Sequence, residues 1–139
     1  GTWQLTKMAM PHLLKSEDGN VVNITSVAGV RPMGSSIAYS MTKAALNQMT
    51  RLMAKSHGPV RHNAVAPGLV ETPWTKDWAN QHAGVAAMAP LKRSATPDDC
   101  AEATLALVRN KYVTGVLDMC AADLRPVDVA ARQAARRGA

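Results

Sequence analysis

Apolar residues recur every three or four positions from almost the first residue of the chain. Leu5, Met8, Ala9 and Leu13 follow this spacing, which is typical of one face of an amphipathic helix. A stable helix usually begins with a capping residue or a loop, and neither precedes this one. The simplest interpretation is that further sequence lies upstream of Gly1.

Short β-branched runs alternate with helical patterns over the rest of the chain. Residues 21–25 (VVNIT), 60–68 (VRHNAVAPG) and 112–120 (YVTGVLDMC) are typical of buried strands. Residues 26–36 are rich in turn-forming residues and predict a loop, whereas 69–95 looks irregular, with weak helical patches around 74–89. This alternation predicts parallel strands with helices packed on both faces, in a narrow sheet of three strands.

Two long segments carry the clearest helical patterns. From about Ile37 to His57, an apolar side is predicted from Ala45, Met49 and either Leu52 or Met53. A later helix begins near Thr96, which suits the N-cap, and Pro97, which suits the first helical position. Its predicted apolar stripe is Ala101, Leu105 and Val108.

The composition indicates a globular protein, with 47% hydrophobic and 19% charged residues among 139. No apolar run approaches the roughly 18 residues that a membrane-spanning helix needs, so no membrane association is expected. Cys100 and Cys120 are too few for a disulfide framework and too far apart for a metal-binding knuckle. We therefore expect no metal site and a cytoplasmic location.

The formal net charge of +6 raises the possibility of nucleic-acid binding. Arg132, Arg136 and Arg137 nevertheless belong to a short tail, and without them 13 basic residues face 10 acidic ones. The remaining charge does not form a basic face with interleaved aromatic residues, which argues against a nucleic-acid partner. A basic interaction module stays as a rival hypothesis, and it predicts salt-sensitive nucleic-acid binding that depends on the arginine tail.

Three polar residues could converge at one edge of the sheet. Tyr39 and Lys43 are four residues apart on the predicted helix and share one face, while Ser26 follows the first strand. A phenol is a poor acid or base at neutral pH, but a neighbouring ammonium group favours its phenolate form. A serine hydroxyl beside it could hydrogen-bond a substrate carbonyl. Taken singly, each residue is more often packing material or part of a turn.

The joint pattern is far more specific. The segments NVVNITSVAG, AYSMTKAALNQMTRLMA and VRHNAVAPGLVETP resemble, in order and spacing, the C-terminal half of the short-chain dehydrogenase/reductase family. The resemblance implies a Rossmann-like, doubly wound α/β fold, present only as its C-terminal half. We expect residues 1–124 to form this part of an NAD(P)-binding domain, with residues 125–139 as a basic, flexible tail.

The resemblance also implies roles for individual residues. Tyr39 matches the catalytic acid/base, Lys43 the lysine that tunes it and binds the nicotinamide ribose, and Ser26 the serine that orients the carbonyl. Cofactor binding is implied for Tyr39 and Lys43 together with the segment that seats the nicotinamide, which comprises Pro67, Gly68, Val70 and Thr72. The implied reaction is hydride transfer between NAD or NADP and a small carbonyl or alcohol, in a homodimer or homotetramer.

Several features depart from the family pattern. The chain has no glycine-rich phosphate-binding turn, and the family's further catalytic Asn would fall just upstream of Gly1. The alternative is therefore a truncated, non-catalytic fragment that cannot bind cofactor by itself. His62 stands where the family usually has Val, which predicts a tolerated core or edge histidine. Trp74 and Trp78 fall in the family's mobile lid, where they could line an apolar substrate pocket.

Overall fold

Three parallel strands form the sheet of the computed structural model, which describes residues 1–119. Strand β2 (Arg61–Val65) is central, between β1 (Asn20–Ile24) and β3 (Leu117–Asp118). Asn20 lies opposite Arg61 in the register, and Ala64 lies opposite Leu117. The parallel sheet confirms the predicted fold class, while residues 120–139, including Cys120 and the predicted tail, lie outside the described part.

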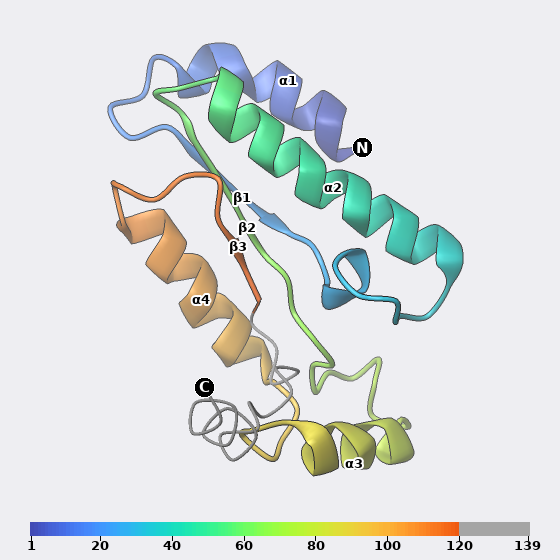
Figure 1. Ribbon diagram of the computed structural model, residues 1–139. Coiled ribbons are helices and arrows are strands. Elements are labelled where there is room, and N and C mark those ends of the chain that lie inside the picture. Colours follow the sequence, from blue (N-terminus) through green and yellow to red (C-terminus); the bar gives the residue numbers. More distant parts are fainter. Residues whose placement is uncertain (120–139) are drawn as a thin grey trace, which may run out of the picture.

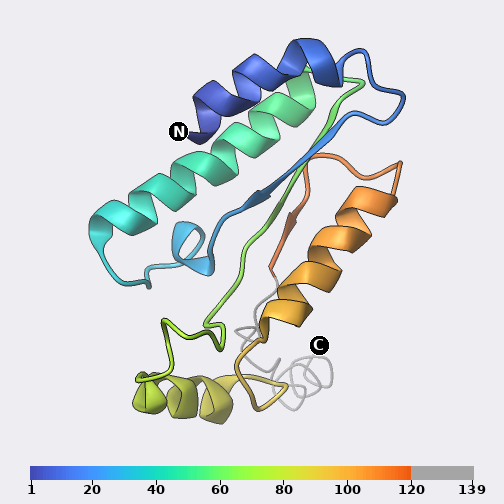
Figure 2. The ribbon, with the colours of Figure 1, turned by 180° about the vertical axis from the view of Figure 1, so that it is seen from behind.

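Helices cover both faces of the sheet, as predicted. Figures 1 and 2 show α1 (Thr2–Leu13) and α2 (Ile37–Ser56) together on one face, with α4 (Pro97–Arg109) on the other. The short helix α3 (Ala79–Met88) lies beyond the end of the sheet, in the segment predicted to be irregular. Among residues 1–119, no helix is both long and apolar enough to cross a membrane.

The third strand is much shorter than the predicted range of residues 112–120. The backbone N–H of His62 donates to the side-chain hydroxyl of Thr114 at 3.0 Å instead of to a backbone carbonyl. Gly115 follows in a left-handed conformation, with φ of 78°, and donates its N–H to the His62 carbonyl at 2.7 Å. This turn takes the place of ladder pairing, so regular pairing begins only at Leu117.

The buried side of α2 agrees in part with the prediction: Met53, one of the two predicted alternatives, is buried, and Met49 packs partly buried against the same core cluster, whereas Ala45 is exposed. Leu52 is 56% exposed, whereas Asn47, Thr50 and Met53 are buried beneath α2. Burial of Thr50 is possible because its hydroxyl accepts a 2.9 Å hydrogen bond from the Asn23 amide of β1. On α1, Thr6 and Met10 are the buried residues, while the apolar Leu5 and Met8 remain exposed.

Helix α4 begins where the sequence predicts, but it buries other side chains than the predicted apolar stripe. Thr96 forms a capping box with Asp99, and this satisfies N–H groups of the first turn. The predicted apolar stripe was wrong, since Leu107 is buried and Leu105 is 37% exposed. The buried guanidinium of Arg61 ties the end of α4 to β2, because it donates to the Leu107 carbonyl at 2.9 Å and to other carbonyls at the end of the helix.

Candidate active site

The carboxyl ends of β1 and β2 are held side by side. The backbone N–H of Thr25 donates to the Val65 carbonyl at 2.7 Å, and that of Val27 donates to the Pro67 carbonyl at 3.0 Å. Ser26 therefore lies next to Pro67, at the edge where open parallel sheets bind ligands. The structure thus brings together the two strand ends that the sequence singled out.

Ser26 begins a tight turn rather than a plain loop. Residues Val27–Gly29 form a single 3₁₀ turn (η1), and the Ser26 hydroxyl oxygen accepts the Ala28 N–H at 3.2 Å. The side chain is buried, with 8% of the residue exposed. Because the oxygen accepts this bond, the hydroxyl hydrogen remains available to a substrate oxygen.

Tyr39 and Lys43 project from the first turns of α2. The helix starts at Ile37, where the Ser36 hydroxyl caps it by accepting the Tyr39 N–H at 3.1 Å. The Lys43 ammonium nitrogen lies 5.7 Å from the centre of the Tyr39 ring. The same nitrogen donates a 3.0 Å hydrogen bond to the carbonyl of Ile24 at the end of β1.

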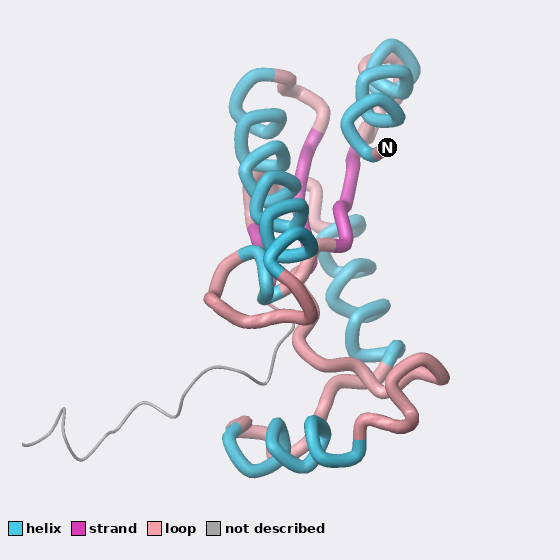
Figure 3. Tube along the Cα trace, turned by 90° about the vertical axis from the view of Figure 1, so that its right-hand side faces the viewer, coloured by secondary structure: helices cyan, strands magenta, loops and turns pink. Residues whose placement is uncertain are grey.

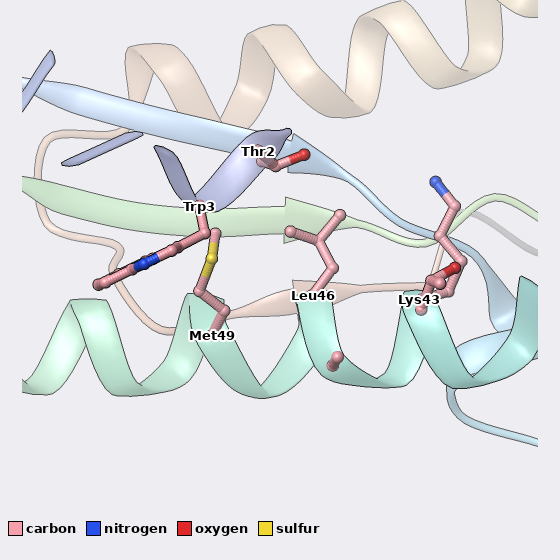
Figure 4. Close-up of a pocket in the computed structure, with 7 residues that line it drawn as sticks. Thr2, Trp3, Lys43, Leu46 and Met49 are labelled. Carbon is pink, nitrogen blue, oxygen red and sulfur yellow. The ribbon is translucent and has the colours of Figure 1, made fainter. Parts of the chain in front are cut away.

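A shallow groove of about 480 Å³ reaches Lys43 from the side of α1. Figure 4 shows the lysine side chain on α2, with Leu46 and Met49 along the same helix and with Thr2 and Trp3 from α1. The lining is mainly apolar, so the ammonium group is the charged group of this groove.

Close packing of η1 against α2 fixes the site. A Cβ atom added to Gly29 would lie 2.5 Å from the Lys43 carbonyl carbon and 2.7 Å from the Ala44 nitrogen. Both are backbone atoms, so only glycine permits this approach. Gly29 is not among the predicted site residues, although a glycine soon after a strand end is a sequence signal for such a close approach.

The segment after β2 runs towards the start of α4. Val70 forms a parallel bridge with Ala95, and the Thr72 N–H donates to the Thr75 hydroxyl oxygen at 3.0 Å. Pro67 thus lies beside Ser26, whereas Val70 and Thr72 belong to a second group of contacts with Thr75 and Ala95. Gly68 joins the two and is partly exposed.

Thr75, His82 and Ser94 connect this second group to α3, and the sequence analysis gave none of them a role. His82 Nδ1 lies 2.7 Å from the Ser94 hydroxyl oxygen, and its Nε2 lies 3.2 Å from the Thr75 carbonyl oxygen. The three residues are separated by 7 and 12 positions, so no local spacing pattern links them. Trp74 and Trp78 flank Thr75, with ring centres 5.4 Å apart and Trp74 76% exposed.

His62 is a fully buried core residue of the central strand. Neither ring nitrogen has a hydrogen-bond partner. Burial lowers the pKa of the imidazole, and the positive charge of His57 lowers it further. Burial thus favours the neutral imidazole inside the sheet, and within residues 1–119 no cluster of metal-ligating side chains is found.

Residues 1–119 match the family described as enoyl-(acyl carrier protein) reductase. A ketoacyl reductase of the granaticin polyketide synthase from Streptomyces violaceoruber is 52% identical over 119 residues, which cover 83% of this chain and 48% of that protein. The short-chain dehydrogenase/reductase homolog YusR of Bacillus subtilis is 34% identical, over 83% of this chain and 90% of its own length. The chain thus spans about half the length of the ketoacyl reductase and most of the length of YusR.

Solved structures give the same picture. A short-chain dehydrogenase/reductase from Burkholderia xenovorans superposes with a TM-score of 0.73 and 33% identity, over 84% of this chain and 47% of that one. A 3-oxoacyl-(acyl carrier protein) reductase from Brucella melitensis with bound NAD gives a TM-score of 0.79 and 29% identity, over 88% and 47% of the two chains. The three-stranded sheet therefore corresponds to part of a larger Rossmann-like sheet in these proteins.

Proposed function

The chain belongs to the short-chain dehydrogenase/reductase family, and we propose that it carries the catalytic site of an NAD(P)-dependent oxidoreductase acting on a carbonyl or alcohol. The observation that carries this proposal is the position of the Lys43 ammonium nitrogen. It lies 5.7 Å from the Tyr39 ring and is fixed by a 3.0 Å bond to the carbonyl of Ile24. A lysine fixed in this way beside a partly exposed tyrosine suits proton transfer at a substrate oxygen.

Each side chain has a distinct task in the proposed reaction. A bound nicotinamide cofactor supplies or accepts the hydride. Tyr39 donates its phenolic proton to the carbonyl oxygen during reduction and takes it back from the alcohol during oxidation. The Lys43 charge favours the phenolate that remains, and the Ser26 hydroxyl donates a hydrogen bond to the same substrate oxygen.

The residues present fit the nicotinamide end of a cofactor. An ammonium group has three N–H donors and Lys43 uses one on Ile24, so donors remain for ribose hydroxyls. The Thr72 hydroxyl and the backbone after Pro67 offer polar groups of the kind that bind a carboxamide. We assign Tyr39, Lys43, Pro67, Gly68, Val70 and Thr72 to this end of NAD or NADP.

Two further proposals concern the substrate and the assembly. The names of the relatives indicate 3-oxoacyl thioesters as the first carbonyl substrates to test. Exposed apolar residues on α1 and α2, among them Leu5, Met8 and Leu52, support a homodimer or homotetramer that buries this face.

One observation favours a second candidate, a non-catalytic fragment. In the described part of the chain the sheet has three strands and β1 pairs on one side only. The ketoacyl reductase and the Brucella melitensis reductase are each about twice as long as this chain. A site that holds only the nicotinamide end of the cofactor would bind it weakly by itself.

Titration of the chain with NADH and NADPH distinguishes the two candidates. Nicotinamide fluorescence that saturates at micromolar concentration, and weakens in Thr72→Ala, supports the oxidoreductase. Absence of binding up to millimolar concentration supports the non-catalytic fragment. Reduction of an acetoacetyl thioester then tests for turnover, with Tyr39→Phe as the inactive control.

A further inference from the structure

Residues 69–95 form a segment that leaves the sheet and returns to it, and two backbone hydrogen bonds join its two ends. The Glu71 N–H donates to the Ala95 carbonyl at 2.8 Å, and the Ala95 N–H donates to the Leu69 carbonyl at 3.1 Å. Between these points the chain extends outwards and includes α3, which Figure 3 shows well away from the sheet. No residue of α3 is buried, so apolar packing does little to hold the helix in place.

His82 supplies a polar link between α3 and both ends of this segment. Its Nδ1 lies 2.7 Å from the hydroxyl oxygen of Ser94, and its Nε2 lies 3.2 Å from the carbonyl oxygen of Thr75. A carbonyl only accepts, so Nε2 carries the hydrogen, and in the neutral ring Nδ1 accepts the Ser94 hydroxyl. Both partners are buried, with Ser94 2% and Thr75 5% exposed. Loss of the imidazole would leave the buried Ser94 hydroxyl without this bond, which is costly, whereas the Thr75 carbonyl would keep the N–H of Trp78 at 3.0 Å.

Thr75 continues the link into the proposed cofactor-binding segment. Its hydroxyl donates to the Val70 carbonyl at 2.7 Å and accepts the Thr72 N–H at 3.0 Å. A change in the position of Thr75 must therefore move one or both of these residues. The path runs from α3 through His82 and Thr75 to Thr72, and every contact in it is a short polar one.

We propose that His82 is a positioning residue that fastens α3 to the segment Val70–Thr72 and so keeps that segment in its cofactor-binding conformation. The hydrogen bonds that link α3 to this segment lie within the chain and form without a cofactor; we call them the fastening. Its effect on cofactor affinity rests on the proposed function. His82 acts through Thr75 and touches neither the substrate nor the reacting atoms.

Hydrogen exchange followed by mass spectrometry tests the fastening without cofactor. In His82→Ala, backbone amides over residues 72–94 are expected to exchange about tenfold faster, as the loss of two hydrogen bonds implies. Amides of α2 serve as the internal reference and should not change. Gln81→Ala, an exposed neighbour on the same helix, is the matched control. Unchanged exchange over 72–94 in His82→Ala would overturn the proposal.

Two conservative variants separate the two hydrogen bonds of His82, which are the Thr75 arm (Nε2 to the Thr75 carbonyl) and the Ser94 arm (Nδ1 to the Ser94 hydroxyl). His82→Gln keeps a donor near the position of Nε2 and should restore protection around Thr72 and Thr75. His82→Asn keeps an acceptor near Nδ1 and should restore protection only near Ser94. If His82→Ala also loses protection in α2, then Ser94→Ala, which leaves α3 intact, takes its place with the same expectation near Ser94. Equal exchange in all three His82 variants would contradict a link with two arms.

NADH titration of the same proteins measures cofactor affinity, which should not change if His82 only stabilises α3. Affinity should fall about tenfold in His82→Ala, recover in His82→Gln and stay low in His82→Asn, because only the Thr75 arm reaches Thr72. Equal affinity in the wild type and His82→Ala would overturn the cofactor part of the proposal. A wild-type chain that binds no NADH contradicts the proposed function instead, and the exchange data alone then decide the fastening.

Discussion

The ammonium group of Lys43 binds the carbonyl of Ile24 at 3.0 Å, so the helix that carries Tyr39 is tied to the end of β1. This tie crosses from helix to strand over 19 residues of sequence, and it fixes the lysine before any ligand arrives. Lys43 therefore has a structural role in addition to the chemical role proposed for it. The same side chain also lines the groove beside α1.

Replacement of Lys43 by Met keeps most of the apolar stem but removes the charge and the bond to Ile24. We expect the unfolding free energy to fall by about 1–2 kcal/mol, since a charged donor to a carbonyl is lost. NADH affinity should fall at least tenfold in a titration. Lys43→Arg is the matched control, because it keeps the charge with different geometry and should recover stability more than affinity.

Tyr39→Phe removes the phenolic hydroxyl, which is the proposed acid/base, and keeps the aromatic ring. We expect the turnover number for an acetoacetyl thioester to fall by about a hundredfold or more. NADH affinity should stay within about twofold, because the ring and Lys43 remain. Tyr112→Phe, at a fully exposed tyrosine, should leave both quantities unchanged. Full activity in Tyr39→Phe would remove Tyr39 from the mechanism.

Gly29→Ala should disturb the site through packing. The new methyl group would lie 2.5 Å from the Lys43 carbonyl carbon, so η1 and α2 must separate. We expect a loss of about 1–3 kcal/mol in chemical denaturation. Gly84→Ala is the opposite case, since its Cβ meets nothing within 4 Å and lies inside α3. That variant should gain about 0.5–1 kcal/mol from helix propensity.

His62 should make the fold sensitive to mild acid. Burial lowers its pKa in the folded state, so the unfolded chain binds the proton more readily. The contribution to stability is complete above the ordinary histidine pKa of about 6.5 and is lost as the pH falls below that value. Denaturation series between pH 7.5 and pH 5 should show this slope in the wild type and a weaker one in His62→Val.

An exposed histidine provides the control for that experiment. His12 lies on the outside of α1, and His12→Gln should keep the wild-type slope. Identical pH dependence in His62→Val and the wild type would mean that His62 does not couple protonation to folding.

The sequence predicted the order of elements well, because periodicity and capping are local properties. Thr96 and Pro97 marked the start of α4 correctly, Ser26 follows β1, and Lys43 binds the carbonyl at the end of that strand. The predictions failed where distant contacts decide orientation. Thr50 is buried because Asn23 binds it, from a position 27 residues earlier.

Residues 69–95 show the same limit of prediction from the sequence. Weak helical patches indicated that a helix could form near 74–89, and α3 occupies Ala79–Met88. The link from His82 to Ser94 depends on how the chain folds back, which hydrophobic periodicity does not encode. Trp74 is mostly exposed and its ring is tilted by 55° against that of Trp78, so the idea that the pair lines a substrate pocket stays a prediction.

The packing of η1 on α2 at Gly29 has a consequence for how the chain folds. Ser26, Tyr39 and Lys43 all belong to one continuous stretch, so their arrangement needs only short-range contacts and little loop-closure entropy. The proposed cofactor segment joins them through β1–β2 pairing, as in the hydrogen bond between Thr25 and Val65, which are 40 residues apart. Sequence separation therefore differs within the proposed site: its proposed acid/base residues lie within one stretch of 18 residues (26–43), whereas its proposed cofactor contacts depend on completion of the sheet.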